Sequence, residues 1–408
     1  MQLENVRSDA SAEIAPRGPA TGWLLSVLSR LRLGRLDVTL PGGETQAVVG
    51  AEPGPQGELT LRRPLRLALR VLARGDLGFG EAYVAGDWDA RRPADTLSLL
   101  ALNETALWVG NGRVLRVLDR LQHRLRRNDR RGSRRNIAAH YDLGNDFYRL
   151  WLDPGMTYSA ALFVAPGETL ESAQERKYDA ILDRLGAKAG EHLLEIGCGW
   201  GGLAERAARR GLRVTGITLS QAQLDYARAR IAAAGLADRV DLRLQDYRDL
   251  KETFDHVVSI EMFEAVGEEY WPTYFATIGR CLKPGGRASL QVITIDEVAF
   301  QHYRRSADFI QKHVFPGGML PSVTAFDAAA AGAGLAVAER TFHGLDYAET
   351  LRRWEALFRA RESEIAALGY AARFRRLWRY YLAYCEAGFR TGRIDLMQVA
   401  LTRNGAPR

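Results

Sequence analysis

A short apolar run that leads directly into a glycine-rich turn is the feature that most limits how this chain can fold. Residues 192–196 read His-Leu-Leu-Glu-Ile, and a helical spacing of apolar residues begins at Leu203. Between them, glycine occupies every second position of a loop: Gly197, Gly199 and Gly201. Glycines at such a site let the backbone turn sharply and let a ligand approach it closely. The segment therefore predicts a strand, a ligand-binding loop and a helix, in that order.

Strand and helix patterns alternate through the rest of this part of the chain. Four more strands are predicted along the chain: residues 213–218, 240–244, 254–260 and 288–293. Strands that are separated by helices favour a parallel sheet with helices on both faces. We therefore expect a doubly wound, Rossmann-like α/β domain over residues 137–408.

The first part of the chain has a different pattern and predicts a smaller, separate domain. Residues 1–20 are rich in Ala, Pro and Gly, and we expect them to be disordered. Apolar residues recur at helical spacing over Leu24–Leu33, whereas residues 36–72 alternate apolar and polar residues between Gly and Pro, as strands do. Residues 21–112 are therefore predicted to form a small α+β domain.

A basic segment separates the two predicted domains. Ten arginines lie between Arg113 and Arg135, and the apolar residues among them share one helical face. We expect an amphipathic helix and linker over residues 113–136, which suits either a membrane surface or a solvated connection. The net charge of +7 favours an anionic partner, which could be nucleic acid, anionic lipid or an acidic substrate.

The cysteine count and the hydrophobic pattern narrow the class of protein. The chain has 3 cysteines at no metal-ligand spacing, so we expect neither a disulfide framework nor a metal site. No run approaches the ~20 apolar residues that a membrane span needs. The N-terminus does not resemble a signal peptide. A cytoplasmic protein is therefore expected.

The residues around the glycine loop favour S-adenosylmethionine (SAM) over a dinucleotide. Glu195 stands two residues before Gly197, whereas dinucleotide loops usually read Gly-x-Gly-x-x-Gly with their acid farther along the chain. Ligands of parallel sheets bind at the carboxyl ends of the strands. Candidates to hold the rest of SAM therefore follow the next two predicted strands: Thr218, Leu219, Gln223, Gln245 and Asp246.

Many ordered motifs between residues 70 and 402 resemble those of the cyclopropane-fatty-acyl-phospholipid synthase family. They occur, in family order, at residues 78–89, 140–148, 152–159, 170–174, 218–220, 245–249, 262–264, 315–322 and 346–347. The resemblance implies transfer of the SAM methyl group to the cis double bond of an acyl chain, usually in a membrane phospholipid. It adds Tyr158 and Ser159 to the cofactor-binding candidates.

The resemblance also implies where the enzyme works and with what. A family member would meet the anionic inner face of the membrane as a peripheral protein, so nucleic acid ceases to be an expected partner. Residues 300–322 and the helical, aromatic segment 347–398 would shape an acyl tunnel. The family includes dimers, which leaves a homodimer open.

The site that removes a proton departs from the family pattern. The resemblance implies a bound bicarbonate as the base, held here by Glu264, Tyr347 and the backbone of Ile293. Two further contributors differ, because the family Cys is Ala160 and the family His is Gln291. Gln can donate and accept hydrogen bonds, whereas the side chain of Ala can do neither.

Two products therefore remain open. If bicarbonate binds to Glu264, Gln291 and Tyr347, the carbocation closes to a cyclopropane, which family frequency favours slightly. If the altered base site diverts the cation, loss of a different proton or a hydride shift gives a methyl-branched or methylene chain. A small-molecule methyltransferase and a non-catalytic lipid-binding protein are more distant alternatives. Aromatic rings that could stabilise the cation are Tyr158, Phe163, Phe263, Tyr303, Phe309, Tyr347 and Trp354.

Overall fold

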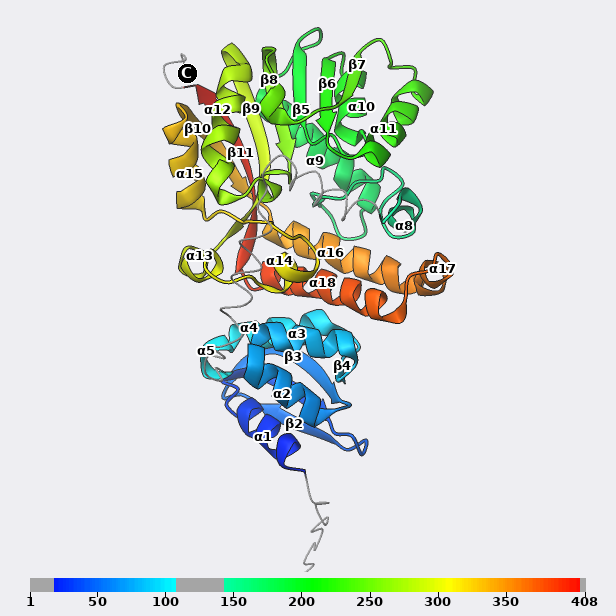
Figure 1. Cartoon of the computed structure of the whole chain (residues 1–408), viewed down its shortest axis with the longest axis vertical. Coiled ribbons are helices and arrows are strands. Elements are labelled where there is room, and N and C mark those ends of the chain that lie inside the picture. The colour runs from blue at the N-terminus through cyan, green and yellow to red at the C-terminus, as the bar shows by residue number, and fades with distance from the viewer. Residues whose placement is uncertain (1–17, 108–142, 404–408) are drawn as a thin grey trace, which may run out of the picture.

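The computed structural model describes residues 18–107 and 143–403. A domain with a seven-stranded sheet lies above a domain with a four-stranded sheet, and helices α16 (Gly344–Ala360) and α18 (Ala372–Arg390) lie between the two sheets (Figure 1). The predicted basic helix and linker at 113–136 fall outside the described residues, as does most of the segment 1–20. Residues 19 and 20 begin helix α1, so the predicted disorder extends too far at its C-terminal end.

The larger sheet confirms the predicted doubly wound arrangement. Its five parallel strands are β5 (His192–Ile196), β6 (Arg213–Thr218), β7 (Val240–Leu244), β8 (Phe254–Ile260) and β9 (Leu282–Ile295). The strand order is β10-β11-β9-β8-β5-β6-β7. The chain runs outward from β5 to β7 and then returns to β8 on the other side of β5. The carboxyl ends of β5 and β8 therefore flank the crevice in which such sheets bind ligands.

Two antiparallel strands complete this sheet and correct the expectation of a helical C-terminal segment up to 398. Strand β11 (Ile394–Arg403) pairs with β9, and β10 (Leu335–Phe342) pairs with β11. Residues 396–401 of β11 are buried on both faces, so they show no alternation of apolar and polar residues that would predict a strand. The pairing of β11 with β9 places Gln398 opposite Gln291.

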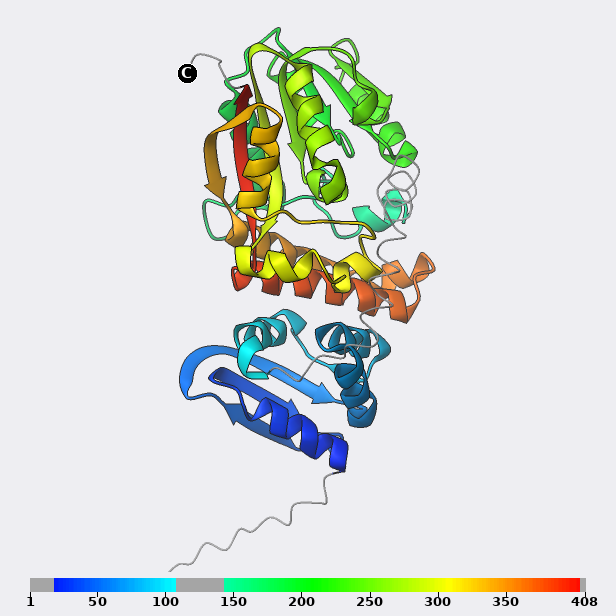
Figure 2. The ribbon, with the colours of Figure 1, turned by 60° about the vertical axis from the view of Figure 1, so that its left-hand side comes forward.

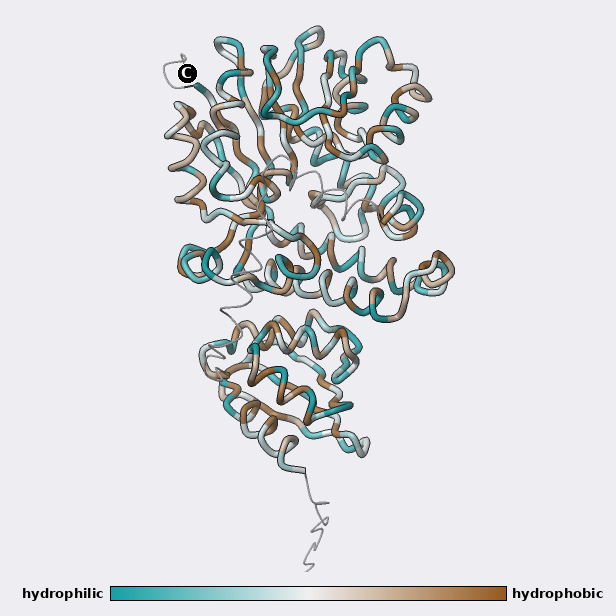
Figure 3. Tube along the Cα trace, in the orientation of Figure 1, coloured by the Kyte–Doolittle hydropathy of each residue, from teal (hydrophilic) through white to brown (hydrophobic). Residues whose placement is uncertain are grey.

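Helices cover both faces of the larger sheet. One apolar cluster joins β8, β9 and β11 to α12 (Trp271–Cys281) and α15 (Val323–Gly332). A second cluster joins β5 and β6 to three other helices: α9 (Leu170–Leu185), α10 (Gly202–Arg209) and α11 (Gln221–Ala233). Figure 2 shows the same elements after a turn of the molecule, and Figure 3 shows hydrophobic residues along the strands between these layers.

The N-terminal domain is α+β, as predicted, but two boundaries differ. Its strands are β1 (Leu33–Thr39), β2 (Thr45–Val49), β3 (Glu52–Leu61) and β4 (Trp88–Asp89), and its helices are α1 (Pro19–Leu28), α2 (Pro64–Arg74), α3 (Asp76–Ala85), α4 (Pro93–Leu102) and α5 (Glu104–Leu107). The first helix ends at Leu28 rather than Leu33. The strand region ends at Leu61, because Pro64 occupies the first turn of a helix, a position that proline favours.

The N-terminal domain shares its core with two elements of the larger domain. Phe309 of α14 (Phe309–His313) and Tyr380 of α18 are buried in the same apolar cluster as Tyr83 and Trp88. Arg376 of α18 donates to the backbone carbonyls of Tyr83 and Trp88, at 2.7 and 3.0 Å. The remaining described helices are α8 (Asn145–Arg149), α13 (Glu297–Tyr303) and α17 (Glu362–Ala367). Over the described residues, no helix combines the length and apolar character needed to cross a membrane.

Candidate active site

The three alternate glycines of the loop after β5 all have left-handed backbones. The φ angles of Gly197, Gly199 and Gly201 are 89°, 50° and 83°. A Cβ atom on Gly197 would lie 3.1 Å from the side chain of Met262, and one on Gly201 would lie 3.1 Å from that of Ala227. A Cβ on Gly199 would meet no protein atom within 4 Å. The loop is thus packed on two sides and leaves open space beside Gly199, where a ligand can approach the backbone.

Glu195, near the end of β5, supplies a buried polar group beside this loop. Its side chain is buried, and Oε2 has no hydrogen-bond partner among the described residues. Burial raises the pKa of Glu195 to about 8. A buried carboxyl oxygen without a partner is costly unless a ligand satisfies it. The ammonium group of SAM would do so, and the residues present therefore fit this methyl donor.

Lys177 is a site residue that the sequence analysis missed. It is fully buried on α9, and Nζ donates to Ser159 Oγ at 2.6 Å and to Gln174 Oε1 at 2.8 Å. Burial lowers the pKa of Lys177 to about 7, against the opposing charges of Glu261, Asp153 and Glu195. Its position three residues after Gln174, on the same helical face, was the signal that could have revealed it.

The candidates at the ends of β6 and β7 lie together. Thr218 Oγ1 donates to Gln223 Oε1 at 3.1 Å, and the Gln245 backbone amide donates to the Thr218 carbonyl at 3.1 Å. Leu219 is half-buried between Thr218 and the N-terminus of α11. The carboxylate of Asp246 accepts from the Arg248 guanidinium at 2.7 Å. These residues thus lie close together at the carboxyl ends of β6 and β7. Their contacts with SAM stay a prediction.

A carboxylate to which the sequence analysis gave no role occupies the centre of the predicted base site. Glu261 directly follows β8. Its Oε2 accepts from Tyr347 Oη at 2.5 Å, and its Oε1 accepts from Gln291 Nε2 at 2.7 Å and from the Ala160 amide at 2.9 Å. These contacts cross 86, 30 and 101 positions of the chain, so no local pattern indicated them.

These residues do not fit a bound bicarbonate. Gln291, Tyr347 and the backbone at Ala160 all donate to Glu261, and the Ile293 amide donates to Glu264 Oε1 at 2.6 Å. Protein carboxylates therefore already occupy the donors that the family resemblance assigned to the free anion. A bicarbonate would have to displace one of these carboxyl groups or add a further negative charge beside them.

The two carboxyl groups differ in their surroundings. Burial raises the pKa of both, but Glu261 also accepts three hydrogen bonds and feels the positive charge of Lys177, which favour its ionised form. Glu264 accepts one hydrogen bond, and its buried Oε2 has no partner among the described residues. Burial, and then the charge of Glu261, raise the pKa of Glu264 to about 8. The hydrogen bonds and the charge of Lys177 therefore favour ionisation of Glu261 more than that of Glu264.

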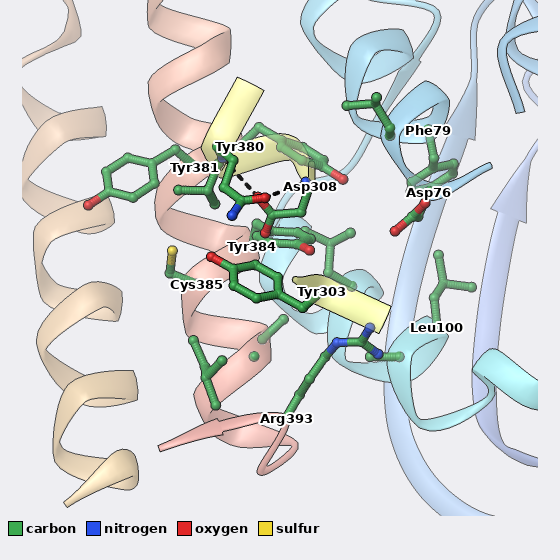
Figure 4. A pocket seen from close by; sticks show the side chains of 18 of the residues that line it. Asp76, Phe79, Leu100, Tyr303, Asp308, Tyr380, Tyr381, Tyr384, Cys385 and Arg393 are labelled. Atoms are coloured by element: carbon green, nitrogen blue, oxygen red, sulfur yellow. Dashed lines mark hydrogen bonds between the residues drawn. The ribbon is translucent and has the colours of Figure 1, made fainter. Parts of the chain in front are cut away.

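A largely apolar cavity of about 520 Å³ extends from this pair into the N-terminal domain. Its walls include Glu261 and Glu264 near one end and Trp23 and Leu28 of α1 near the other. Figure 4 shows its middle part, where Tyr303 and Cys385 point toward each other. The segment 300–322 and α18 line it, as predicted for a tunnel, but so do α1 to α5, which was not predicted.

The aromatic candidates divide into two groups. Tyr158, Tyr303 and Tyr347 line the cavity, and Tyr158 Oη shares a hydrogen bond of 2.8 Å with Tyr381. The other four lie outside its walls and pack against protein groups: Phe163, Phe263, Phe309 and Trp354. Only the first group is placed to meet a substrate in the cavity.

The parallel sheet, the open glycine loop and the buried Oε2 of Glu195, which has no partner among the described residues, together define the class of protein: a SAM-dependent methyltransferase. The family model for mycolic acid cyclopropane synthetase matches residues 128–399. The chain belongs to this family.

Individual relatives agree with this assignment. The chain is 40% identical to the tuberculostearic acid methyltransferase UfaA1 of Mycobacterium tuberculosis, over 99% of this chain and 97% of the relative. It is 37% identical to the cyclopropane-fatty-acyl-phospholipid synthase of Escherichia coli K12, over 82% of this chain and 85% of the relative. A crystal structure of the mycolic acid cyclopropane synthase CmaA1, complexed with SAH and CTAB, covers 66% of this chain and 97% of its own, with 34% identity and a TM-score of 0.62.

Proposed function

We propose that this enzyme transfers the methyl group of SAM to the double bond of an unsaturated acyl chain of a membrane phospholipid, and that the product keeps a double bond. The observation that best supports a lipid substrate is the long cavity that ends at Glu261 and Glu264. Apolar walls suit an acyl chain, and a cofactor loop lies beside the polar end, since Met262 contacts Gly197. A small polar substrate would not need a cavity that crosses two domains.

The polar end of the cavity meets the demands of alkene methylation. SAM supplies an electrophilic methyl group, but an alkene is a weak nucleophile and reacts only when it is held in line and away from water. The largely apolar walls of the cavity provide few polar groups that would hold water beside the chain. The rings of Tyr158, Tyr303 and Tyr347 face the cavity and can stabilise the positive charge that forms on the chain.

The altered base site supports a product other than a ring. Ala160, Gln291 and Glu261 together replace the free-anion site that the family resemblance implies. Three relatives are named as methyltransferases of fatty acids or of tuberculostearic acid rather than as cyclopropane synthases, and one of them matches 99% of this chain. We therefore favour a hydride shift or proton loss that leaves a methyl-branched or methylene chain. Ring closure, which the sequence favoured slightly and the E. coli relative's name supports, is the second candidate.

Expression in a bacterial host that makes monounsaturated phospholipids, but lacks its own cyclopropane-forming enzyme, tests both candidates. Mass spectrometry of the released fatty acids should show monounsaturated chains that are heavier by one CH₂ group. Proton NMR should show vinylic signals for the proposed product, whereas high-field ring signals would establish the cyclopropane candidate. Unchanged chains in cells that contain the folded protein would contradict a lipid substrate.

The exposed residues on and beside helix α2 support the proposal that the protein binds peripherally to an anionic membrane. Leu65, Leu69 and Leu72 lie on one face of α2 and are 62%, 58% and 49% exposed. Arg62 and Arg63 lie just before this helix and are exposed as well. Exposed leucines beside arginines are the composition of helices that lie in the interface of an anionic bilayer. The opposite face of α2, with Leu67 and Val71, lines the cavity, so a docked membrane would lie close to it.

Replacing Leu65, Leu69 and Leu72 together with Gln should weaken binding to anionic phospholipid vesicles at least about tenfold, since each leucine inserted into lipid contributes about 1 kcal/mol or more. Vesicle sedimentation measures the effect. The matched control replaces three other exposed leucines with Gln, namely Leu244, Leu345 and Leu368, and should bind as the wild type does. Equal binding by both triple variants would remove α2 from the docking surface.

A further inference from the structure

We infer that Glu261 is the proton acceptor of the reaction and that its carboxylate takes the place of a free bicarbonate ion. This inference rests on the proposed function, because it assigns the base for that methyl transfer. It concerns a residue that lies outside the set implied by the family resemblance. Four features of the structure support it: a chain of hydrogen-bond donors, the backbone conformation of Glu261, the small size of residue 160 and the position of the carboxylate. The chemistry of the step also balances with this carboxylate as the base.

The donors around Glu261 form a chain that runs in one direction. Arg184 Nη1 donates to Gln398 Oε1 at 2.5 Å, and Gln398 Nε2 donates to Gln291 Oε1 at 2.8 Å. Gln291 Nε2 then donates to Glu261 Oε1 at 2.7 Å. Each amide accepts with its oxygen, so its NH₂ group must face the next acceptor. A chain that starts at a guanidinium and ends at a carboxylate favours the ionised carboxylate, which is the form that accepts a proton.

The backbone of Glu261 has an unusual conformation, which directs its carboxylate toward these donors. Its φ of 49° is left-handed, and among the described residues Met156 is the only other non-glycine residue with a positive φ. Such a conformation is strained for a residue with a side chain and persists only where the surroundings hold it. The hydrogen bonds from Tyr347, Gln291 and the Ala160 amide hold it here.

The small side chain of Ala160 makes room for this arrangement. Ala160 is completely buried, and its amide is 2.9 Å from Glu261 Oε1. A longer side chain at this fully buried position would have to displace its neighbours, and the backbone partner of this position is the Glu261 carboxylate.

The carboxylate lies at the wall of the cavity, one residue from a contact with the cofactor loop. Glu261 lines the cavity together with Glu264 and Tyr347. The next residue, Met262, packs against Gly197 of that loop. A methyl group that passes from the loop to a chain in the cavity therefore arrives beside Glu261.

The step balances with Glu261 as the only base. The π electrons of the alkene form the new bond to the methyl carbon, and the electron pair of the broken carbon–sulfur bond stays on sulfur. The carbocation on the acyl chain then loses a proton to the Glu261 carboxylate. The electron pair of that C–H bond forms the double bond of the proposed product, or the third ring bond of a cyclopropane. Tyr347 keeps its proton, because burial raises its pKa well above the usual value.

The purified enzyme tests this inference in buffer stripped of carbon dioxide, with SAM and vesicles of monounsaturated phospholipid. Wild-type turnover should be the same with and without added bicarbonate. Glu261→Gly, which suits a left-handed backbone, should lose about 100-fold or more, the usual contribution of a general base. Added bicarbonate or acetate should restore part of this loss, since either anion can bind the donors that Glu261 has vacated. Glu261→Gln fills the space with an amide and should be neither active nor restored.

Wild-type turnover that depends on bicarbonate would overturn the inference, and this result does not require any variant to fold. Full turnover of Glu261→Gly without an added anion would also overturn it. Titration with S-adenosylhomocysteine separates a lost base from a lost cofactor site, since both variants should bind this product as the wild type does. A wild-type enzyme that binds the cofactor product but methylates no unsaturated lipid would contradict the proposed function instead.

Discussion

Gly199→Leu should abolish measurable binding of SAM and S-adenosylhomocysteine while the protein stays folded. A Cβ at this position meets no protein atom within 4 Å, so a leucine would extend into the space reserved for the ligand. We expect affinity to fall at least about 100-fold, which corresponds to about 2.8 kcal/mol of lost binding free energy. Isothermal titration calorimetry with S-adenosylhomocysteine measures this loss without any turnover.

The matched control for backbone strain is Gly186→Leu. Gly186 ends α9 with φ of 66°, and its Cβ position is also open. Both variants should lose about 1–2 kcal/mol of unfolding free energy, the cost of a left-handed residue that has a side chain. Only Gly199→Leu should lose binding. If both variants bind equally well, the ligand does not approach the loop at Gly199.

Cys385→Trp should stop turnover on phospholipid while leaving cofactor binding intact. Cys385 lies on α18, and its side chain points into the middle of the cavity toward Tyr303 (Figure 4). An indole at this position would close the path between the N-terminal domain and Glu264. We expect kcat/KM to fall at least about 100-fold, or about 2.7 kcal/mol, for vesicles of monounsaturated phospholipid.

Two further variants separate blockage from damage to the helix. Ala372→Trp adds the same side chain at the exposed start of α18 and should retain turnover. Cys385→Ser keeps the size of the wild-type side chain and should stay active. Retained turnover of Cys385→Trp in a well-folded protein would show that the acyl chain follows another route.

The features that could be predicted from the sequence are those that depend on neighbouring residues. Strands β5 to β8 and residues 288–293 of β9 were predicted from the local sequence pattern, as were the loop glycines that follow β5. Residues 282–287, the first part of β9, were not predicted. Nor was strand β11, since its buried residues 396–401 lack alternation. The contribution of the N-terminal domain to the cavity walls was not predicted either. It requires the two domains to pack together, through contacts such as that of Arg376 of α18 with Tyr83, which crosses 293 positions.

The base site shows the same limit in more detail. The substitutions at Ala160 and Gln291 were visible, and they indicated that the family arrangement had changed. The compensating residue, Glu261, was also visible at the end of β8, three residues before Glu264. Its role depends on a left-handed turn and on donors from three distant segments, which only the folded chain brings together.

Because the walls of the cavity come from two domains, a bound substrate becomes part of the interface between these domains. Trp23 and Leu28 of one domain and Tyr381 of the other line the same space. A ligand that binds only when both walls are in place stabilises their docked arrangement by mass action. A bound acyl chain would therefore hold the two domains together. The two domains should unfold in a single transition when lipid is bound, and their unfolding transitions should separate when lipid is absent.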